Sequence, residues 1–202
     1  VHTRPNAFIK RNQVSNTKNM LKWVGTHSSI FTSVSYFDVP FIGTLREELL
    51  NWSFFYLDPR EHMRMASPVR EVHRMGEMGE DISAFLNTLR YADETQFKAV
   101  ESALHMIVPS ITGINVDVNR LGEVELTFME GQTPVSSRIV SDGTLRALGL
   151  LALSGVEEKP SLIGFEEPES GIDPRRLQLI ASLLMSRATH SSQMIVTTHS
   201  PV

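Results

Sequence analysis

Residues 161–169, with the sequence SLIGFEEPE, place a short apolar run directly before three carboxylates. Such a run predicts a buried strand, and the carboxyl ends of parallel strands form the edge where an α/β sheet binds its ligands. At that edge, phosphoryl transfer needs one carboxylate to hold Mg²⁺ and a second to position or deprotonate the attacking water. An isolated pair of glutamates is more often an ordinary acidic loop, so this stretch alone indicates a fold and not an activity.

Two other segments carry candidate phosphate-binding residues. In residues 140–144 (VSDGT), Ser141 is suited to cap the apolar helix that follows, and Gly143 lets the backbone approach an anion at the helix start. Residues 193–201 (QMIVTTHSP) predict a strand that ends near His199, which can donate a hydrogen bond to a γ-phosphate oxygen. Each segment alone is more typical of ordinary structure, but their order and spacing favour a phosphate site.

From Gly43 to about residue 109, the apolar residues have the spacing of helices. This spacing predicts one helix from Gly43 to the break at Asp58-Pro59, a second after the loop at Gly79, and a third over residues 95–108. On one face, the first of these helices is expected to present Leu45, Leu49, Leu50 and Trp52. We expect the three helices to form a lobe.

After Pro109 the period of the apolar residues falls to two, which predicts strands over residues 111–118, 124–128 and 135–140. Helices and strands then alternate over residues 142–153, 162–165, 174–187 and 194–197. Such alternation is typical of an α/β fold with a mostly parallel sheet flanked by helices. We therefore expect amino-terminal strands and turns in residues 1–42, the helical lobe in 43–118 and the nucleotide-binding core in 119–202.

Composition excludes several classes of protein. The 202 residues are 41% hydrophobic with a net charge of -4, which allows one core but does not fit a strongly basic nucleic-acid-coating domain. The absence of cysteine excludes a disulfide frame, a zinc ribbon and a thiol nucleophile. Without an apolar run of about 18 residues or a secretion signal, we expect no membrane contact and a cytoplasmic location.

Positive charges precede the first acidic residue, Asp38, at five positions: Arg4, Lys10, Arg11, Lys18 and Lys22. They form either a strip that contacts phosphate or a solvated face that happens to lack acids, and the second interpretation is favoured. The chain also begins with Val and stops directly after a predicted strand. We expect it to be a piece of a longer protein.

The three segments VSDGTLRALGLLAL, SLIGFEEPESGIDP and QMIVTTHSPV resemble the signature motif, the Walker B motif with its D-loop, and the H-loop of ABC-class ATPase heads. The resemblance is to the RecF-like and OLD-like AAA-type branch of DNA repair and antiphage proteins, including the ATPase subunits of Septu and retron-type systems. It covers residues 45–202 and implies the carboxyl-terminal part of an ABC ATPase head. The helical lobe that carries the signature is then expected to include Trp52, Phe55 and residues 57–59.

The same resemblance implies a role for each motif residue. The signature residues would contact the γ-phosphate of an ATP held by the opposite subunit, and Asp173 would be the D-loop acid. The implied nucleotide-binding residues are Ser141, Asp142, Gly143, Thr144 and Asp173. Glu167 falls on the catalytic glutamate and His199 on the switch histidine, while Glu166 falls where the Mg²⁺-associated acid is usually Asp. Asp173 is also placed to cap the helix that Pro174 begins.

One motif of such heads is missing. None of the 12 glycines is followed by Lys, so the chain has no P-loop, and the Q-loop is not assignable. We expect the P-loop to lie upstream or on another chain, and the 202 residues alone to be inactive. The completed protein is expected to bind and hydrolyse ATP with Mg²⁺, to dimerise around ATP, and to control DNA or a nuclease, either a partner or a fused domain.

Two other functions compete with an ATPase head. The first is a non-catalytic nucleotide-binding or DNA-interaction module that scaffolds a partner, although the intact Glu167 and His199 argue against lost turnover. The second is a magnesium nuclease that uses Glu166, Glu167 and Glu169, which is weakened because no further acidic cluster is apparent. An upstream P-loop sequence would decide for the ATPase.

Overall fold

The computed structural model describes residues 40–153, 160–189 and 191–201. The chain divides into two compact units, with the boundary between Leu49 and Leu50. The described part of the first unit is helix α2 (Pro40–Leu50) except for its last residue. Strands and turns were expected up to residue 42, but residues 40–42 already belong to α2, and the basic positions from Arg4 to Lys22 lie outside the described residues.

The predicted first helix ends earlier than expected, because strand β1 (Trp52–Phe55) begins two residues after α2. The expectation that Trp52 continues the helical face and belongs to a helical lobe is therefore wrong. Aromatic residues favour strands, and β1 pairs in parallel with β6 (Leu162–Glu166), with Trp52 opposite Leu162. The rings of Phe55 and Phe165 stack 5.8 Å apart, which anchors the pair.

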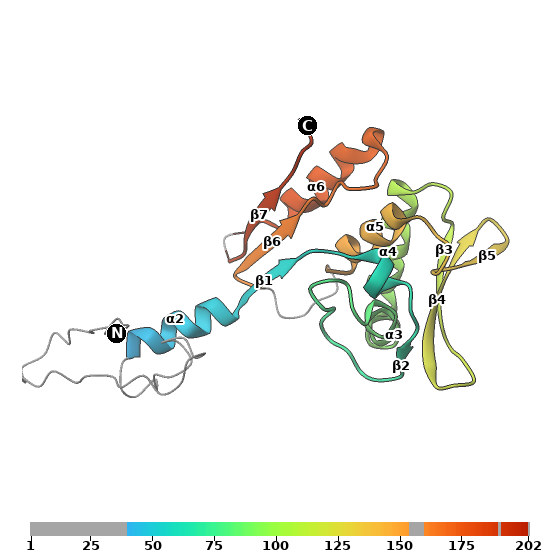
Figure 1. The fold of residues 1–202 in the computed structure, drawn as a ribbon, viewed down its shortest axis with the longest axis horizontal. Coiled ribbons are helices and arrows are strands. Elements are labelled where there is room, and N and C mark those ends of the chain that lie inside the picture. The colour runs from blue at the N-terminus through green and yellow to red at the C-terminus, as the bar shows by residue number, and fades with distance from the viewer. Residues whose placement is uncertain (1–39, 154–159, 190, 202) are drawn as a thin grey trace, which may run out of the picture. The chain divides into compact units, whose positions relative to one another are not determined.

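A parallel sheet with the strand order β1-β6-β7 carries the predicted carboxylates and histidine (Figure 1). Strand β7 (Gln193–Thr197) pairs with β6, and the connection between them contains a short helix η3 (Pro174–Arg176) and helix α6 (Leu177–Arg187). On one face of the sheet, Phe55, Ile163 and Phe165 share a buried core with α5 (Asp142–Ala152) and α6. The predicted α/β fold, with a parallel sheet flanked by helices, is confirmed.

A second, antiparallel sheet lies in the middle of the chain. It has the order β2-β4-β3, with β5 paired to β4, and its strands are β2 (Ser67–Pro68), β3 (Gly113–Val118), β4 (Glu123–Glu130) and β5 (Thr133–Ser136). Helices α3 (Ile82–Ala92) and α4 (Glu94–Ile107) contact this sheet. The segment 43–118 thus holds strands as well as helices, because β3 and β4 form one hairpin across its predicted end.

The core of the second unit joins both sheets to helices α3, α4 and α5. Among its most deeply buried side chains are Leu86, Leu104, Phe128, Leu145 and Leu148. Helix α5 is apolar on nearly every side and is buried along most of its length, as the sequence predicts. Among the described residues, each helix falls short of the length and apolar character that a membrane span requires.

Candidate nucleotide site

Ser141 caps helix α5 as predicted. Its backbone is extended (φ -63°, ψ 149°), and its Oγ accepts a hydrogen bond of 3.1 Å from the backbone N–H of Thr144. The same Oγ lies 2.8 Å from Thr144 Oγ1, and Thr144 is buried. Ser141 itself is exposed, so the loop presents a polar residue at the helix start, where free N–H groups favour an anion.

Gly143 lies against the backbone of the loop that follows β6. A Cβ at this position would meet the carbonyl oxygen of Gly171 at 1.8 Å, and Gly171 itself has a φ of +78°. Glycine is therefore needed here for a contact inside the chain, since backbone cannot move aside as a flexible side chain can. The sequence suggested only that Gly143 lets an anion approach; the structure adds that the signature and D-loop segments touch.

Asp142 directs its carboxylate toward η1 (Pro59–Met63). Its Oδ2 accepts from Arg60 Nε at 3.0 Å and its Oδ1 from Arg64 Nη2 at 2.6 Å. The hydrogen bond from Arg64, followed by that from Arg60, holds the pKa of Asp142 below its ordinary value. Direct contact of this carboxylate with nucleotide stays a prediction, and its oxygens are already engaged.

The carboxyl edge of the parallel sheet brings Glu167 and His199 together. Glu167 Oε1 lies 3.0 Å from His199 Nε2, and Glu167 Oε2 accepts a 2.9 Å hydrogen bond from Ser170 Oγ. The backbone N–H of Glu167 donates to Thr197 O at 3.0 Å. Glu167 has a φ of +43°, in the left-handed region that non-glycine residues rarely adopt and that is common at functional sites.

Glu169 was not assigned a role in the ATP site, but it fixes the segment that carries His199. Its Oε1 accepts hydrogen bonds from Thr198 Oγ1 at 2.6 Å and from the backbone N–H of His199 at 2.9 Å. Partial burial acts to raise the pKa of Glu169, but the hydrogen bonds from Thr198 and the backbone outweigh it and lower the pKa. The third carboxylate of SLIGFEEPE was the signal in the sequence that could have identified it.

Asp173 caps η3, as predicted, by accepting a 3.0 Å hydrogen bond from the backbone N–H of Arg175. The Arg175 guanidinium also bonds its carboxylate, and this contact chiefly lowers the pKa of Asp173 to about 2. A hollow of about 560 Å³ opens between the signature segment, the D-loop segment and the end of α4. Its polar lining residues are Ser141, Thr144, Asp173, Arg175 and Arg176, with Gly143 and Gly171 beside them.

The predicted residues thus form two groups. Four of the five implied nucleotide-binding residues line the hollow, whereas Asp142 does not. Glu167 and His199 are in contact at the sheet edge, with Glu166 next to them opposite Thr197, and none of these three lines the hollow. The structure brings the residues of each group together, and the residues of the second group do not line the hollow of the first.

Glu166 fits a magnesium ion that is held mainly by phosphates and water. Its exposed side chain makes no hydrogen bond within the described residues, and it stands at the end of β6. No cluster of three or more acidic or histidine ligands occurs in the described part of the chain. Mg²⁺ at nucleotide sites commonly uses one or two carboxylates together with phosphate oxygens and water, so a single free carboxylate is sufficient.

Comparison with known proteins bears on the family and the fold of the chain. Residues 36–202 match the family model described as "AAA domain, putative AbiEii toxin, Type IV TA system". No curated protein matches the chain. Among solved structures, an Smc head bound to the C-winged helix domain of ScpA has a TM-score of 0.55 at 14% identity, over 84% of this chain and 54% of that one.

Two further Smc head structures are less similar. One, from Pyrococcus furiosus, has an extended coiled coil and is bound to the C-terminal domain of ScpA; its TM-score is 0.44 at 13% identity, over 56% of this chain and 30% of that one. The other, from Pyrococcus yayanosii, has a coiled coil and joint, with a TM-score of 0.41 at 14% identity, over 55% and 23%. The chain spans at most 54% of the length of these structures. It belongs to the AAA domain family described above, and its fold is that of an ABC-type ATPase head.

Proposed function

We propose that this chain is the signature-bearing part of a head that binds and hydrolyses ATP and dimerises around it. The separation of the two groups of residues carries the proposal. A chain that presents signature and D-loop residues around one hollow, and Glu167 with His199 elsewhere, suits a site composed from two subunits. One subunit supplies Ser141 and Gly143, and the other supplies Glu167, His199 and the P-loop that these 202 residues lack.

In this proposal Glu167 is the general base. Its Oε2 is held by Ser170 and its Oε1 by His199, so the carboxylate has a fixed orientation from which to accept a proton from water. His199, whose side chain is 89% exposed, can turn its Nε2 from Glu167 toward a γ-phosphate oxygen. Bound Mg²⁺ would neutralise phosphate charge, and Glu166 is the residue that would hold it.

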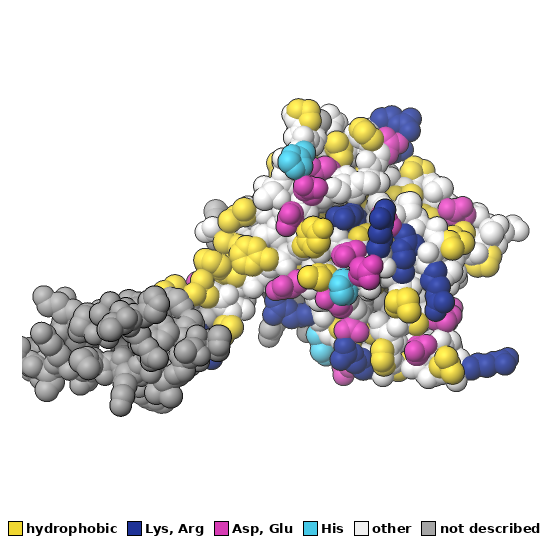
Figure 2. All heavy atoms as spheres, viewed as in Figure 1, with side chains coloured by type: hydrophobic (Ala, Val, Ile, Leu, Met, Phe, Trp, Pro, Cys, Tyr) yellow, Lys and Arg dark blue, Asp and Glu magenta, His cyan; other side chains and the backbone are white. Residues whose placement is uncertain are grey.

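The biological role that we propose is antiphage defence within the RecF-like and OLD-like branch, with a nuclease or DNA as the controlled partner. The matched family description names a putative toxin of a Type IV TA system, which favours defence over repair. The face drawn in Figure 2 intersperses acidic and basic side chains over the described residues of the second unit. This face therefore offers no uniformly basic surface to DNA, and a protein partner fits it better.

The test of the composite site uses protein that includes a P-loop. Glu167→Gln should bind ATP but lose about a hundredfold or more in turnover, because an amide cannot take the proton. It should therefore accumulate as an ATP-bound dimer, which light scattering detects. Normal turnover by this variant would refute the assignment of Glu167, and a scaffold that never hydrolyses ATP would show no turnover in the wild type either.

Ser141→Arg, added to Glu167→Gln, should abolish the ATP-dependent dimer while ATP binding by the subunit's own P-loop persists. The arginine would fill the space next to the helix start that the opposite subunit's phosphate occupies. Ser102→Arg is the matched control, since Ser102 is an exposed serine on α4 that is distant in sequence from the signature loop. A dimer that survives Ser141→Arg would exclude the two-subunit arrangement.

A further inference from the structure

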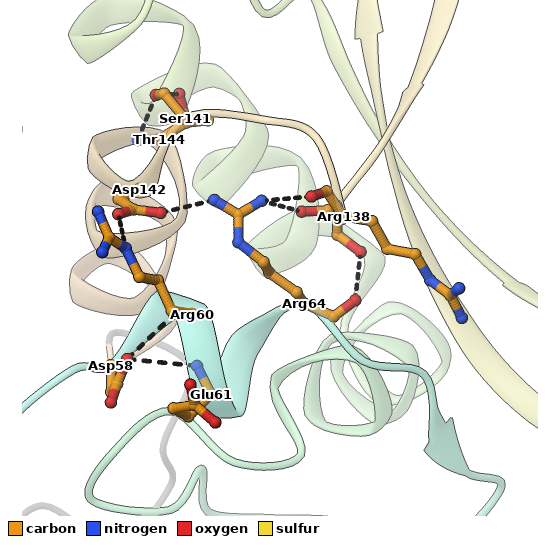
Figure 3. Close-up of polar contacts among 9 residues, drawn as sticks. Asp58, Arg60, Glu61, Arg64, Arg138, Ser141, Asp142 and Thr144 are labelled. Atoms are coloured by element: carbon orange, nitrogen blue, oxygen red, sulfur yellow. Dashed lines mark hydrogen bonds and ion pairs between the residues drawn. The ribbon is translucent and has the colours of Figure 1, made fainter.

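Arg64 follows η1 and reaches the loop that leads from β5 into α5. Only 18% of its side chain is exposed, compared with 80% for Arg60, although both contact Asp142. Figure 3 shows the Arg64 guanidinium between Asp142 on one side and the backbone at Arg138 on the other. The residue is far from the signature in sequence and carries no motif that the sequence identified.

Its contacts hold the loop at three points. Nη1 donates to the carbonyl oxygens of Ser137 and Arg138, both at 2.8 Å, and Nη2 donates to Asp142 Oδ1 at 2.6 Å. In return, the buried Ser137 donates its Oγ proton to the backbone carbonyl of Arg64 at 3.0 Å. A planar guanidinium can make such divergent contacts at once, whereas a lysine ammonium is a single point charge.

The charge of Asp142 gives a second reason for this arrangement. A carboxylate next to Ser141 and Gly143 would repel a triphosphate approaching the start of α5. Arg64 and Arg60 each engage one of its oxygens and offset that charge. Arg64 alone also fixes the main chain before Ser141, because Arg60 makes no contact with the loop carbonyls among the described hydrogen bonds.

We propose that Arg64 is the positioning residue of the signature loop. It acts through Asp142 and the carbonyls of Ser137 and Arg138, holding residues 137–142 so that Ser141 and Gly143 face the phosphate of the opposite subunit's nucleotide. Asp142 is then part of this support and not a nucleotide contact. The inference rests on the proposed function, and it adds a residue from outside the motifs to the ATP site.

The experiment measures the ATP concentration for half-maximal dimerisation in the Glu167→Gln background, in protein that includes the P-loop. Arg64→Lys and Arg64→Ala should each raise it about tenfold or more, corresponding to the loss of at least one charge-assisted hydrogen bond. ATP binding by the subunit's own P-loop, measured at concentrations where the protein is monomeric, should stay unchanged. If Arg64 only stabilised the fold, its replacement would weaken ATP binding as well as dimerisation.

Arg138→Lys and Arg138→Ala are the matched controls. Arg138 contributes only its carbonyl, and its side chain points away from the cluster in Figure 3, so neither change should shift dimerisation. Arg60→Ala should have a smaller effect than Arg64→Ala, since it removes one exposed contact. If Arg60→Ala and Arg64→Ala raised the ATP concentration for half-maximal dimerisation equally, the two arginines would act by neutralising the charge of Asp142, and the positioning role of Arg64 would be refuted.

The remaining outcomes separate this inference from the proposed function. If Ser141→Arg abolishes the dimer but both Arg64 variants dimerise normally, the inference fails and the proposed function stands. If Ser141→Arg has no effect, the proposed function fails first. If Arg64→Lys, which keeps the charge and most of the stem, loses its native circular dichroism, Arg64 supports the fold and positioning is overturned.

Discussion

Glu169 joins the D-loop to the H-loop through one carboxylate oxygen that accepts hydrogen bonds from Thr198 and from the backbone of His199. Its pKa is lowered from the ordinary value of 4.5 because these hydrogen bonds outweigh the opposing effect of partial burial. A carboxyl group with a lowered pKa stabilises the folded state above its unfolded pKa. That stabilisation is lost as the pH falls through the folded pKa.

Glu169→Gln should therefore destabilise the chain more at about pH 7 than at about pH 3. The amide keeps an acceptor oxygen but loses the charge that strengthens both hydrogen bonds. Urea unfolding of the 202-residue chain at both pH values measures this difference. Glu130→Gln, at the exposed end of β4, is the control, and its effect on the free energy of unfolding should be the same at both pH values. An effect of Glu169→Gln that is also independent of pH would contradict the assigned contacts.

Single residues differ in how far the sequence could predict them. Ser141 as a cap, and Glu166 and His199 at strand ends, follow from patterns within a few neighbouring residues. The contact between Glu167 and His199 also follows, because adjacent parallel strands end at one edge. Arg64 could not be found in this way, since its partners lie on a loop that only the tertiary fold brings near.

Helix α5 contains two glycines that face different surroundings. Gly143, at its start, touches the backbone of Gly171, whereas a Cβ at Gly149 would meet the side-chain ends of Leu57 at 2.6 Å and Met63 at 3.0 Å. Side-chain ends can rotate or shift, but the carbonyl of Gly171 belongs to a tight turn. The two positions therefore distinguish a backbone constraint from ordinary packing.

Gly143→Ala should destabilise the chain by roughly 1–3 kcal/mol or more, as overpacking against rigid atoms does. Gly149→Ala should destabilise the chain less, because the higher helix propensity of alanine, about 1 kcal/mol above glycine, offsets part of the cost of crowding. Urea unfolding of both variants provides the comparison. A Gly149→Ala variant less stable than Gly143→Ala would show that the two backbones can separate at little energetic cost.

Among the elements, the sequence identified the helices from α3 onward and the strands β3, β4, β6 and β7 from their periods. The strand predicted over residues 135–140 is wrong in its second half, because β5 ends at Ser136 and the chain then turns toward α5. It missed β1, a strand of four residues whose partner β6 is distant in the chain. The apolar residues from Leu45 to Trp52 fit a helix locally, and only pairing with Leu162 shows that the last of them is extended. Tertiary pairing, which no local window contains, overrode the helical pattern.

At the scale of the whole molecule, part of one face of the parallel sheet is exposed in the described part of the second unit. Phe54 is 52% exposed and Ile195 54% exposed, and both stand in the row that passes through Gly164 of the central strand. Parallel sheets normally bury both faces. This agrees with the proposal that further parts complete the head, as the missing P-loop also requires.

The 202 residues alone should bind Mg-ATP weakly or not at all. In P-loop sites, most contacts to the α- and β-phosphates come from loop amides and a lysine, and this chain has no Gly-Lys pair. Their absence should reduce affinity by several powers of ten, at about 1.4 kcal/mol for each. Calorimetry is the measurement. Tight binding would reveal a phosphate loop elsewhere, with Gly76 and Gly79 or the basic amino-terminal positions as the first candidates.

The contact between Gly143 and Gly171 also limits how such heads can diverge. A Cβ at position 143 would collide with the carbonyl oxygen of Gly171. A Cβ at position 171 would lie 3.2 Å from Gly143 N, on a backbone with a φ of +78° that already favours glycine, so a change at either position strains the contact. Gly122 and Gly131 also have positive φ, but an added Cβ would meet nothing within 4 Å, and asparagine could replace them. When heads are recombined into chimeras, the loops around residues 143 and 171 should therefore transfer as a pair: a graft of one without the other would bring together two backbones shaped for different partners.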